Sequence, residues 1–561
     1  MRQRIIGHPR LARLARPALG TNREPPTSTA WFKLTTRLLK LQQCVLMFVL
    51  LMLTLPMFIP TTARTHAATI QQPMLLDGGD VLTFSISPNS RYVVYQAVGG
   101  KIYSVALAGG APVELTTTPV STGGYFLISP DSTRVVFAGN DPGASTETLV
   151  SVPLTGGSPT PLASGAISLY RISPDSKRVV YDINQGFSDS SPRDIYSVPI
   201  TSSAAIQLNQ PLTGAQRVEN EQISTDSQQV VYELSAGRFS TDPPHILYRV
   251  PIAGGSPIQI DDAFAADKGA QYLLSPDSAY VVYTRTLPST DPATLQAAPL
   301  AGGPSVQLDT PAGFSGQQSS LTITADSRRA IFSLVTPYDF YSTLLNGTGT
   351  AIKLGPFNIS SVMNTALTPD GQRFVYDNSD GTNYYVSSIP VDGGSTTIFS
   401  STLVPLSLFA ISPDSQRVVY VAGGDELYSE QLFSAPLAGG TAPIRLSDPL
   451  AFPSSFAERD LIFTPDSSTL IYRVKKTTAS NSSYDLFSTP IDKNEPGVKL
   501  NGSLATVAGT AAESLSFRVS PDGKYVIFRA GSDPDIFASR QLYAVALNEI
   551  GFQVFVPLLQ R

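Results

Sequence analysis

Histidine and cysteine are the side chains best suited to nucleophilic and metal chemistry, and this 561-residue chain has three of the first and one of the second. His8, Cys44 and His66 lie within the first 67 residues, so His245 is the only histidine in the remainder. One histidine without cysteine cannot form the usual zinc sites. No Gly-x-Ser-x-Gly turn occurs, and His245 begins an expected strand in "PPHILYRV". We therefore expect neither a Ser-His-Asp triad nor a zinc centre.

Carboxylates are the next candidates, because a pair of Asp or Glu residues can serve as acid and base in glycoside hydrolysis. Nine aspartates, however, occupy the same position of one recurring four-residue motif, and nine equivalent catalytic residues would have no use. Each of these carboxylates is expected to accept backbone N–H bonds within a turn. The nine are Asp131, Asp175, Asp226, Asp277, Asp326, Asp370, Asp414, Asp466 and Asp522.

A calcium or phosphate site is the last chemical possibility that the sequence raises. The stretch "DNSDGTNYY", which begins at Asp377, gathers oxygen ligands and a glycine. It lacks the spacing and the closing glutamate of an EF-hand loop, so we interpret it as a polar loop. Phosphate-cradling motifs of the form Gly-x-x-x-x-Gly-Lys are absent. The sequence thus predicts no catalytic residue, no cofactor-binding residue and no metal ligand.

The motif that holds the nine aspartates occurs ten times, as Ser-Pro-Asp-Ser or a close variant. Asn89 replaces the aspartate in the first copy, and Gly371 and Gly523 replace the last serine in two others. The third positions of successive copies are separated by 42, 44, 51, 51, 49, 44, 44, 52 and 56 residues. Self-similarity at such a period indicates a repeat architecture.

Residues 407–447 show what each repeat is expected to build. A short apolar stretch leads into the turn at 412–415, where proline presets the backbone for a type I turn. Residues 417–420, "RVVY", predict a second strand, and 431–437, "QLFSAPL", predict a third. A Gly-Gly turn precedes a fourth strand at 442–446, in which a proline suits an outer edge. Each repeat therefore predicts a four-stranded antiparallel sheet.

The Ser-Pro-Asp-Gly/Ser turn, the following Arg-Val-Val-Tyr, the Leu-Tyr-Ser-Val-Pro strand and the Gly-Gly hairpin resemble the WD40-like, Pro-Asp-containing repeats of TolB-type proteins. The resemblance covers about residues 72–561. It implies an all-β fold, a β-propeller of about ten four-stranded antiparallel blades. The fold implies no single function, because such propellers serve as binding platforms, as partners of peptidase domains and as envelope subunits. TolB itself has an α/β domain ahead of a six-bladed ring, and no such pattern precedes the first repeat here.

The repeats follow one another without an evident linker, which favours one continuous array that closes into a single large ring. Two smaller propellers, divided near residue 315, are the alternative. Two chain segments are candidates for the outer strand of the last blade: residues 69–76, "TIQQPMLL", and residues 552–559, "FQVFVPLL". Because the second can form its hairpin locally, at a small entropy cost, we expect residues 552–559 to take that position.

Residues 1–67 have the composition of a targeting segment. Residues 1–40 contain nine Arg or Lys and one acid, residues 45–60 are apolar, and Thr65 and Ala67 match a small-residue cleavage site. This pattern predicts a signal peptide with a long basic region. An uncleaved membrane anchor at 45–60 is the alternative, although the apolar run is short for a membrane span. We divide the chain into this leader, 1–67, and the repeats, 68–561.

The charge of the repeat region limits its partners. Without residues 1–67, which hold ten Lys or Arg and one acid, 29 basic and 43 acidic side chains remain, a net charge of about −14. That sign is wrong for nucleic acid, so no nucleic-acid partner is expected. The membrane is expected as a partner only through an uncleaved leader. Without cysteines, the exported chain needs no disulfides.

The function favoured by the sequence is that of a secreted or surface-attached, non-catalytic scaffold that binds a protein or an extracellular polymer. The loops "DINQGFSDSSPRD" at 182 and "RAGSDPDIFASRQ" at 529 are long and unequal between repeats, and such loops often carry binding. The alternative is a propeller enzyme acting on extracellular polysaccharide or peptide. We expect an exported monomer, located outside the cell, at its surface or in the periplasm.

Overall fold

The repeat region, residues 68–561, forms one compact unit built from β-strands. The residues whose structure is described contain 42 strands and no helix, so the all-β fold class is confirmed for this part of the chain. The expected leader lies outside the described residues. The computed structural model describes residues 73–547 apart from 117–119, 121–124, 141–145, 187–190, 215, 236–243, 262–263, 266–271, 286–292, 313, 315–319, 335–338, 356–363, 380–382, 403–407, 424–429, 448–454, 478–481, 496, 503–504, 507–516 and 532–540.

A search of the described residues for a membrane-crossing helix finds none of sufficient length and hydropathy.

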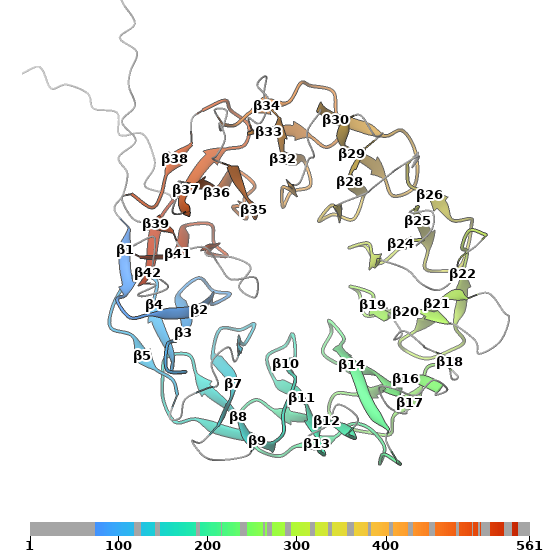
Figure 1. The fold of residues 1–561 in the computed structure, drawn as a ribbon. Helices are drawn as coiled ribbons and strands as arrows, with labels where there is room; N and C mark the ends of the chain where they lie inside the picture. The colour runs from blue at the N-terminus through green and yellow to red at the C-terminus, as the bar shows by residue number, and fades with distance from the viewer. Residues whose placement is uncertain are drawn as a thin grey trace, which may run out of the picture. The chain divides into compact units, whose positions relative to one another are not determined.

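Six sheets contain four strands each, hydrogen-bonded in the order of the chain (Figure 1). Their strands are antiparallel, as the repeats predict. The first three are β2 (Val81–Ile86) to β5 (Val113–Glu114), with β3 (Tyr92–Ala97) and β4 (Ile102–Ala106) between; β6 (Phe126–Ile128), β7 (Arg134–Asn140), β8 (Glu147–Pro153) and β9 (Thr160–Gly165); and β19 (Tyr272–Leu274), β20 (Tyr280–Arg285), β21 (Thr294–Pro299) and β22 (Val306–Leu308). The others are β23 (Leu321–Ile323), β24 (Arg329–Ser333), β25 (Phe340–Leu344) and β26 (Ile352–Lys353); β27 (Thr365–Leu367), β28 (Arg373–Ser379), β29 (Tyr384–Pro390) and β30 (Thr397–Thr402); and β31 (Phe409–Ile411), β32 (Arg417–Gly423), β33 (Glu430–Pro436) and β34 (Ile444–Arg445).

Two larger sheets each join two such four-stranded units. In one, a parallel pairing of β12 with β14 connects β10 (Tyr170–Ile172), β11 (Arg178–Asn184), β12 (Arg193–Pro199) and β13 (Ile206–Gln207) to β14 (Arg217–Ile223), β15 (Gln229–Ser235), β16 (Pro244–Pro251) and β17 (Ile258–Gln259), with β18 (Phe264–Ala265) paired to β16. In the other, β39 (Ala505–Thr506) connects β35 (Ser455–Phe463), β36 (Thr469–Thr477), β37 (Ser482–Pro490) and β38 (Val498–Lys499) to β40 (Phe517–Val519), β41 (Tyr525–Gly531), β42 (Gln541–Ala546) and β1 (Met74–Asp77).

The second strand of each unit is deeply buried, because neighbouring sheets pack against both of its faces. In β32 the run Val418–Val421 is buried, as the strand predicted at 417–420 requires. An aromatic residue of this strand commonly stacks on one of the third strand, such as Tyr420 on Phe433 with centroids 5.8 Å apart. The fourth strand is shorter than predicted: β34 covers only Ile444–Arg445.

Neighbouring units pack face to face through clusters of buried apolar side chains. Val282 and Leu295 of one unit share a cluster with Ile323 and Phe332 of the next, so packing is continuous across residue 315. The last and first units share another cluster. In it, Ile527 and Leu542 pack with Val81 and Phe84.

The outer strand of the last unit comes from the N-terminal side of the repeats, and our expectation for residues 552–559 is wrong. Strand β1 pairs antiparallel with β42, with Met74 opposite Ala544. Leu76 is buried in the cluster between the first and last units. The expectation considered only the entropy of closing a local hairpin. Burial of apolar surface between two units stabilises the N-terminal segment in addition. Residues 69–72 and 552–561 lie outside the described residues.

Candidate functional site

The recurring aspartates have the structural role that the sequence predicts. In all ten turns the first Ser or Thr donates its hydroxyl hydrogen to Oδ1 of the Asp or Asn two residues later, at 2.5–2.8 Å. The same Oδ1 accepts the backbone N–H two residues further on, at 2.9–3.1 Å. The Thr464 hydroxyl is the largest influence on the pKa of Asp466, which lies below its usual value of 3.8.

The last serine of the turn joins each unit to its neighbour. Eight of these serines have a positive φ of 57–62°, a conformation that non-glycine residues seldom adopt. Seven of them accept, on Oγ, the backbone N–H of the Asp or Asn in the preceding turn, and Ser90 accepts that of Asp522 in the last turn, all at 2.9–3.1 Å. Gly371 and Gly523 replace this serine in the other two turns. The turns therefore belong to the framework.

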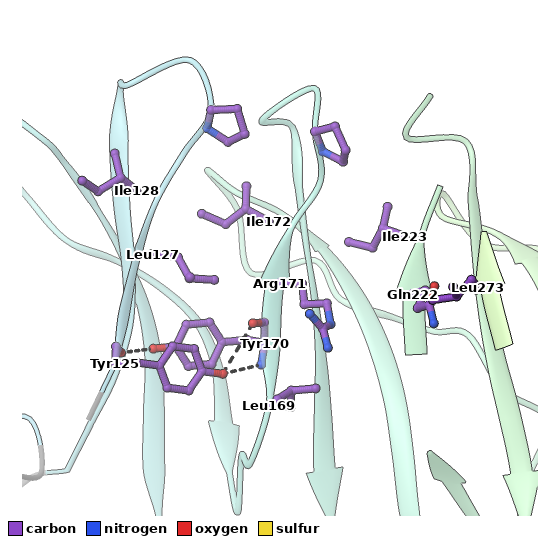
Figure 2. A pocket seen from close by; sticks show the side chains of 12 residues that line it. Tyr125, Leu127, Ile128, Leu169, Tyr170, Arg171, Ile172, Gln222, Ile223 and Leu273 are labelled. Carbon is purple, nitrogen blue, oxygen red and sulfur yellow. Dashed lines mark hydrogen bonds between the residues drawn. The ribbon is translucent and has the colours of Figure 1, made fainter. Parts of the chain in front are cut away.

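A pocket of about 700 Å³ lies among the first strands of four consecutive units, β6, β10, β14 and β19, beside two of the turns (Figure 2). Most of its wall is apolar, and one arginine and one glutamine stand in it. Mixed walls of this kind are typical of ligand sites. The lining residues are Tyr125, Leu127, Ile128, Pro130, Leu169, Tyr170, Arg171, Ile172, Pro174, Gln222, Ile223 and Leu273.

The repeat explains which side chains reach the pocket. Leu127, Arg171, Gln222 and Leu273 each stand two residues before the first residue of a turn, and all four line the pocket. Ile128, Ile172 and Ile223, one residue later, line it as well. Four successive repeats thus place an apolar, a cationic, an amide and a second apolar side chain around one space.

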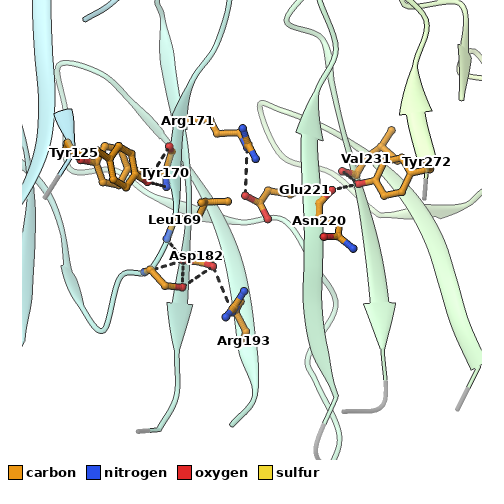
Figure 3. A network of polar contacts seen from close by, with 11 residues as sticks. Tyr125, Leu169, Tyr170, Arg171, Asp182, Arg193, Asn220, Glu221, Val231 and Tyr272 are labelled. Atoms are coloured by element: carbon orange, nitrogen blue, oxygen red, sulfur yellow. Dashed lines mark hydrogen bonds and ion pairs between the residues drawn. The ribbon is translucent and has the colours of Figure 1, made fainter. Parts of the chain in front are cut away.

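Side chains link the first strands of neighbouring units at the level of the pocket (Figure 3). The rings of Tyr125 and Tyr170 stack with centroids 4.4 Å apart, and the Tyr170 N–H donates to the Tyr125 hydroxyl at 2.9 Å. Gln222 donates its amide hydrogen to the Tyr272 carbonyl at 2.9 Å and accepts the Leu274 N–H at 3.4 Å. These contacts occupy backbone groups at the edges of β10 and β19.

Between these two sets of contacts, Arg171 of β10 forms an ion pair with Glu221 of β14. Nε of Arg171 lies 3.6 Å from Oε1 of Glu221. The Glu221 side chain is only 2% exposed, whereas that of Arg171 is 51% exposed. Burial raises the pKa of the Glu221 carboxyl, and the nearby Asp182 acts in the same direction, while Arg171 opposes it. In the pocket wall, the half-exposed guanidinium of Arg171 is therefore paired with the buried carboxylate of Glu221.

An irregularity in β14 sets the position of Glu221. The pairing of β14 with β15 shifts register between Glu219 and Gln222, which is a β-bulge. Asn220, inside the bulge, has a φ of 56° and is the only described non-glycine residue with positive φ outside the turns. Its Nδ2 donates to Glu233 at 2.8 Å, and its carbonyl accepts the Tyr272 hydroxyl. Bulges and strained residues are frequent at functional sites.

His245, the histidine considered above, lies behind this bulge and not in the pocket. Its Nδ1 is bonded to Oε1 of Glu233, and both side chains are buried. Glu233 also accepts the Asn220 amide. These contacts support a role for His245 in holding β14 to its sheet.

The loops singled out in the sequence are only partly described. Asp182 belongs to β11 and not to a loop: its carboxylate accepts the Leu169 N–H at 2.7 Å and pairs with Arg193 at 3.4 Å. The interpretation of the Asp377 stretch as a loop is likewise wrong at its start, because β28 continues to Ser379 and Asp377 accepts the Asn364 N–H at 2.7 Å. Residues 187–190, 380–382 and 532–540 lie outside the described residues. Within the described part, no group of three His, Cys, Asp or Glu side chains could hold a metal ion.

Sequence reasoning missed the pocket, although one signal was available. At the position of Glu221, three residues before a turn, six other repeats have Phe or Tyr. A single acid among aromatic residues marks a repeat that departs from the framework. Asn220 precedes this acid, and residues 219–222 read "ENEQ". Four polar residues in a row are unusual for the first strand of a repeat, which is mostly apolar in the other copies.

No protein-family model matches the chain, and no curated protein matches it. Among solved structures, a eukaryotic initiation factor is similar over 73% of this chain and 95% of its own, with 14% identity and a TM-score of 0.48. A Dos1 propeller is similar over 66% of this chain and 95% of its own, with 12% identity and a TM-score of 0.34. A putative TolB from Agrobacterium tumefaciens is similar over 40% of this chain and 79% of its own, with 22% identity and a TM-score of 0.26.

Proposed function

We propose that this protein is an exported, non-catalytic scaffold that binds a protein or an extracellular polymer, and that the pocket of β6, β10, β14 and β19 is its binding site. The observation that carries the proposal is the composition of that pocket. Four consecutive repeats present apolar side chains around one accessible cation, and the acid behind the cation is buried. Apolar walls supply affinity, and a few polar groups supply orientation.

The scaffold proposed is a single closed propeller of ten blades. Two observations support it: the hydrogen bond from Asp522 to Ser90, and the apolar cluster shared by the last and first units. The continuous packing of Val282 with Phe332 opposes a division into two propellers near residue 315. A closed framework suits a binding role because its pocket is already formed before the ligand arrives.

An enzyme acting on polysaccharide or peptide is the second candidate, and Glu221 is the observation that favours it. Its carboxyl has a raised pKa, as a general acid requires. Glycoside hydrolysis, however, needs a second carboxylate across the scissile bond. Among the described residues that line the pocket, none has an acidic side chain. The lining therefore supports binding better than hydrolysis.

Export is supported by residues 1–67, with their basic stretch, the apolar run at 45–60 and the small residues near Ala67. The absence of cysteine from residues 68–561 fits an extracellular location without disulfide formation. The net charge of about −14 fits a soluble protein without nucleic-acid partners.

A selection experiment tests the proposed function. The purified repeat region is offered a display library of random peptides and an array of extracellular glycans, beside the variant Leu127→Asp. We expect ligands that bind the parent protein and are lost on the variant, because a carboxylate placed in the apolar wall costs binding energy. A matched variant, Ile258→Asp, changes an exposed residue of β17 and should retain them. Ligands that bind Leu127→Asp equally well would place the binding site elsewhere.

A further inference from the structure

Arg171 has hydrogen-bonding capacity that the described part of the protein does not use. A guanidinium group has five N–H donors. The one polar contact of the Arg171 side chain among the described residues is the 3.6 Å approach of its Nε to Glu221. The side chain is half-exposed and stands in the pocket wall between apolar residues (Figure 2). Its terminal nitrogens are therefore available to a ligand.

An arginine in such a position selects a carboxylate in preference to a neutral group, since the two terminal nitrogens match the two carboxylate oxygens. The side chains around it select an aliphatic group. Ile172 lies next to Arg171 in the chain, and Leu127 and Ile223 come from the strands on either side. A ligand that fits has a carboxylate and an aliphatic group within a few ångströms of each other.

The edges of the strands limit how a peptide can approach. A peptide that added to β10 or β19 as a further strand would need the free backbone groups of that edge. Tyr125 already occupies the Tyr170 N–H, and Gln222 already occupies the Tyr272 carbonyl and the Leu274 N–H. These bonds hinder strand addition at Tyr170 of β10 and along β19. A ligand that enters end-on, with one residue supplying both required groups, avoids these occupied positions.

We infer that the pocket receives the C-terminus of a polypeptide that ends in an aliphatic residue, with its terminal carboxylate on Arg171 and its side chain against Leu127, Ile172 and Ile223. Only the last residue of a chain has a carboxylate and an aliphatic side chain on the same Cα. The inference rests on the proposed function and specifies its ligand.

The probes are three fluorescein-labelled peptides, measured by anisotropy. The first, Gly-Ser-Gly-Ser-Val-Leu, has a free C-terminal carboxylate. The second has the same sequence with a C-terminal amide. The third, Gly-Ser-Leu-Asp-Ser-Gly amide, places the carboxylate on an internal side chain. We expect the amide and the internal peptide to bind at least about tenfold more weakly than the acid, since charge-assisted hydrogen bonds are lost.

Variants assign the effect to Arg171. Arg171→Gln should remove the difference between acid and amide. Because Arg171→Gln leaves the buried Glu221 without its ion-pair partner, the double variant R171Q/E221L is also measured. Leucine occupies the position of Glu221 in two other repeats, at Leu321 and Leu461. Arg518→Gln is the matched control. Arg518 holds the corresponding position in the last repeat, over the Phe84 ring, and its loss should leave the difference intact.

Equal affinity for acid and amide, equal affinity for the internal peptide, or no binding of the acid at about 1 mM would each overturn the inference. An unchanged preference in both Arg171 variants would overturn it as well. The proposed function fails separately, if no selected ligand depends on Leu127. Ligands that depend on Leu127 but not on a free carboxylate would leave that function standing and refute the C-terminal ligand alone.

Discussion

The backbone N–H of Asp522 donates to Oγ of Ser90 at 2.9 Å, although the two residues are 432 positions apart. The same bond joins Asp131 to Ser176 and Asp414 to Ser467 in consecutive repeats. The contact that connects neighbours along the chain therefore also connects its last repeat to its first. Ser90 adopts a positive φ to make it, and the hydrogen bond offsets the strain of that conformation.

Replacing Ser90 by Ala should lower the free energy of unfolding by about 1 kcal/mol, since the bond to Asp522 is lost while the strained φ remains. Urea denaturation provides the measurement. Ser132→Ala, which removes the equivalent bond from Asn89 inside the array, is the matched comparison and should have a similar effect. A normal stability for Ser90→Ala, with Ser132→Ala destabilised, would mean that the ends do not meet in solution.

Strand β1 should prove essential to the closure. Leu76→Ala removes a side chain that is buried between the first and last units, and we expect a loss of about 2 kcal/mol or more. Leu75, its neighbour in the same strand, is 51% exposed, so Leu75→Ala should change stability little. Thermal melts of the two variants decide the matter, and equal melting temperatures would contradict the pairing of β1 with β42.

The turns should make the protein sensitive to strong acid. The pKa of Asp466, held down by the Thr464 hydroxyl, lies below its unfolded value of about 3.8. A depressed folded-state pKa stabilises the protein above the unfolded pKa, and this contribution is lost as the pH falls below about 3.8 through the folded value. Asp466→Asn keeps an acceptor oxygen, as Asn89 does naturally. The variant should show a shallower loss of stability between neutral and acid pH in urea titrations; an unchanged pH dependence would refute the assignment.

Glu221 is expected to contribute more to the candidate site than to the stability of the fold. Replacing a buried ion pair by an apolar side chain is often neutral or stabilising, and leucine occupies the equivalent position at Leu321 and Leu461. We therefore expect Glu221→Leu to melt at the same temperature as the parent protein or higher. Glu233→Leu, which also removes the partner of His245 and Asn220, should be destabilising by comparison. A severe loss of stability in Glu221→Leu would make this acid part of the framework.

The turns and second strands are predictable because their determinants are local. Ser412, Asp414 and the backbone around them satisfy one another within a few residues. The bond from Asp414 to Ser467 is not predictable in this way, because it depends on how two turns stack across 53 residues. The last outer strand is not predictable from sequence, because residues 69–76 and 552–559 both have the pattern of a strand. Their sequences do not reveal that Leu76 is buried between two units.

The candidate site was harder to predict, since it is formed by departures from the repeat. The repeat explains why Arg171 and Gln222 face the same space, once their common distance from a turn is noticed. The bulge at Asn220 depends on Glu233 and Tyr272, which lie on other strands. No local pattern predicts those contacts.

Photo-crosslinking in cells that express the protein tests the binding role of the pocket most directly. A benzophenone amino acid is introduced at Leu127, in the pocket wall, or at Ile258, an exposed residue of the outer strand β17. If the pocket is the binding site, irradiation yields a discrete covalent adduct at Leu127 and none at Ile258. No adduct at Leu127, or the same adducts at both positions, would contradict the proposed function.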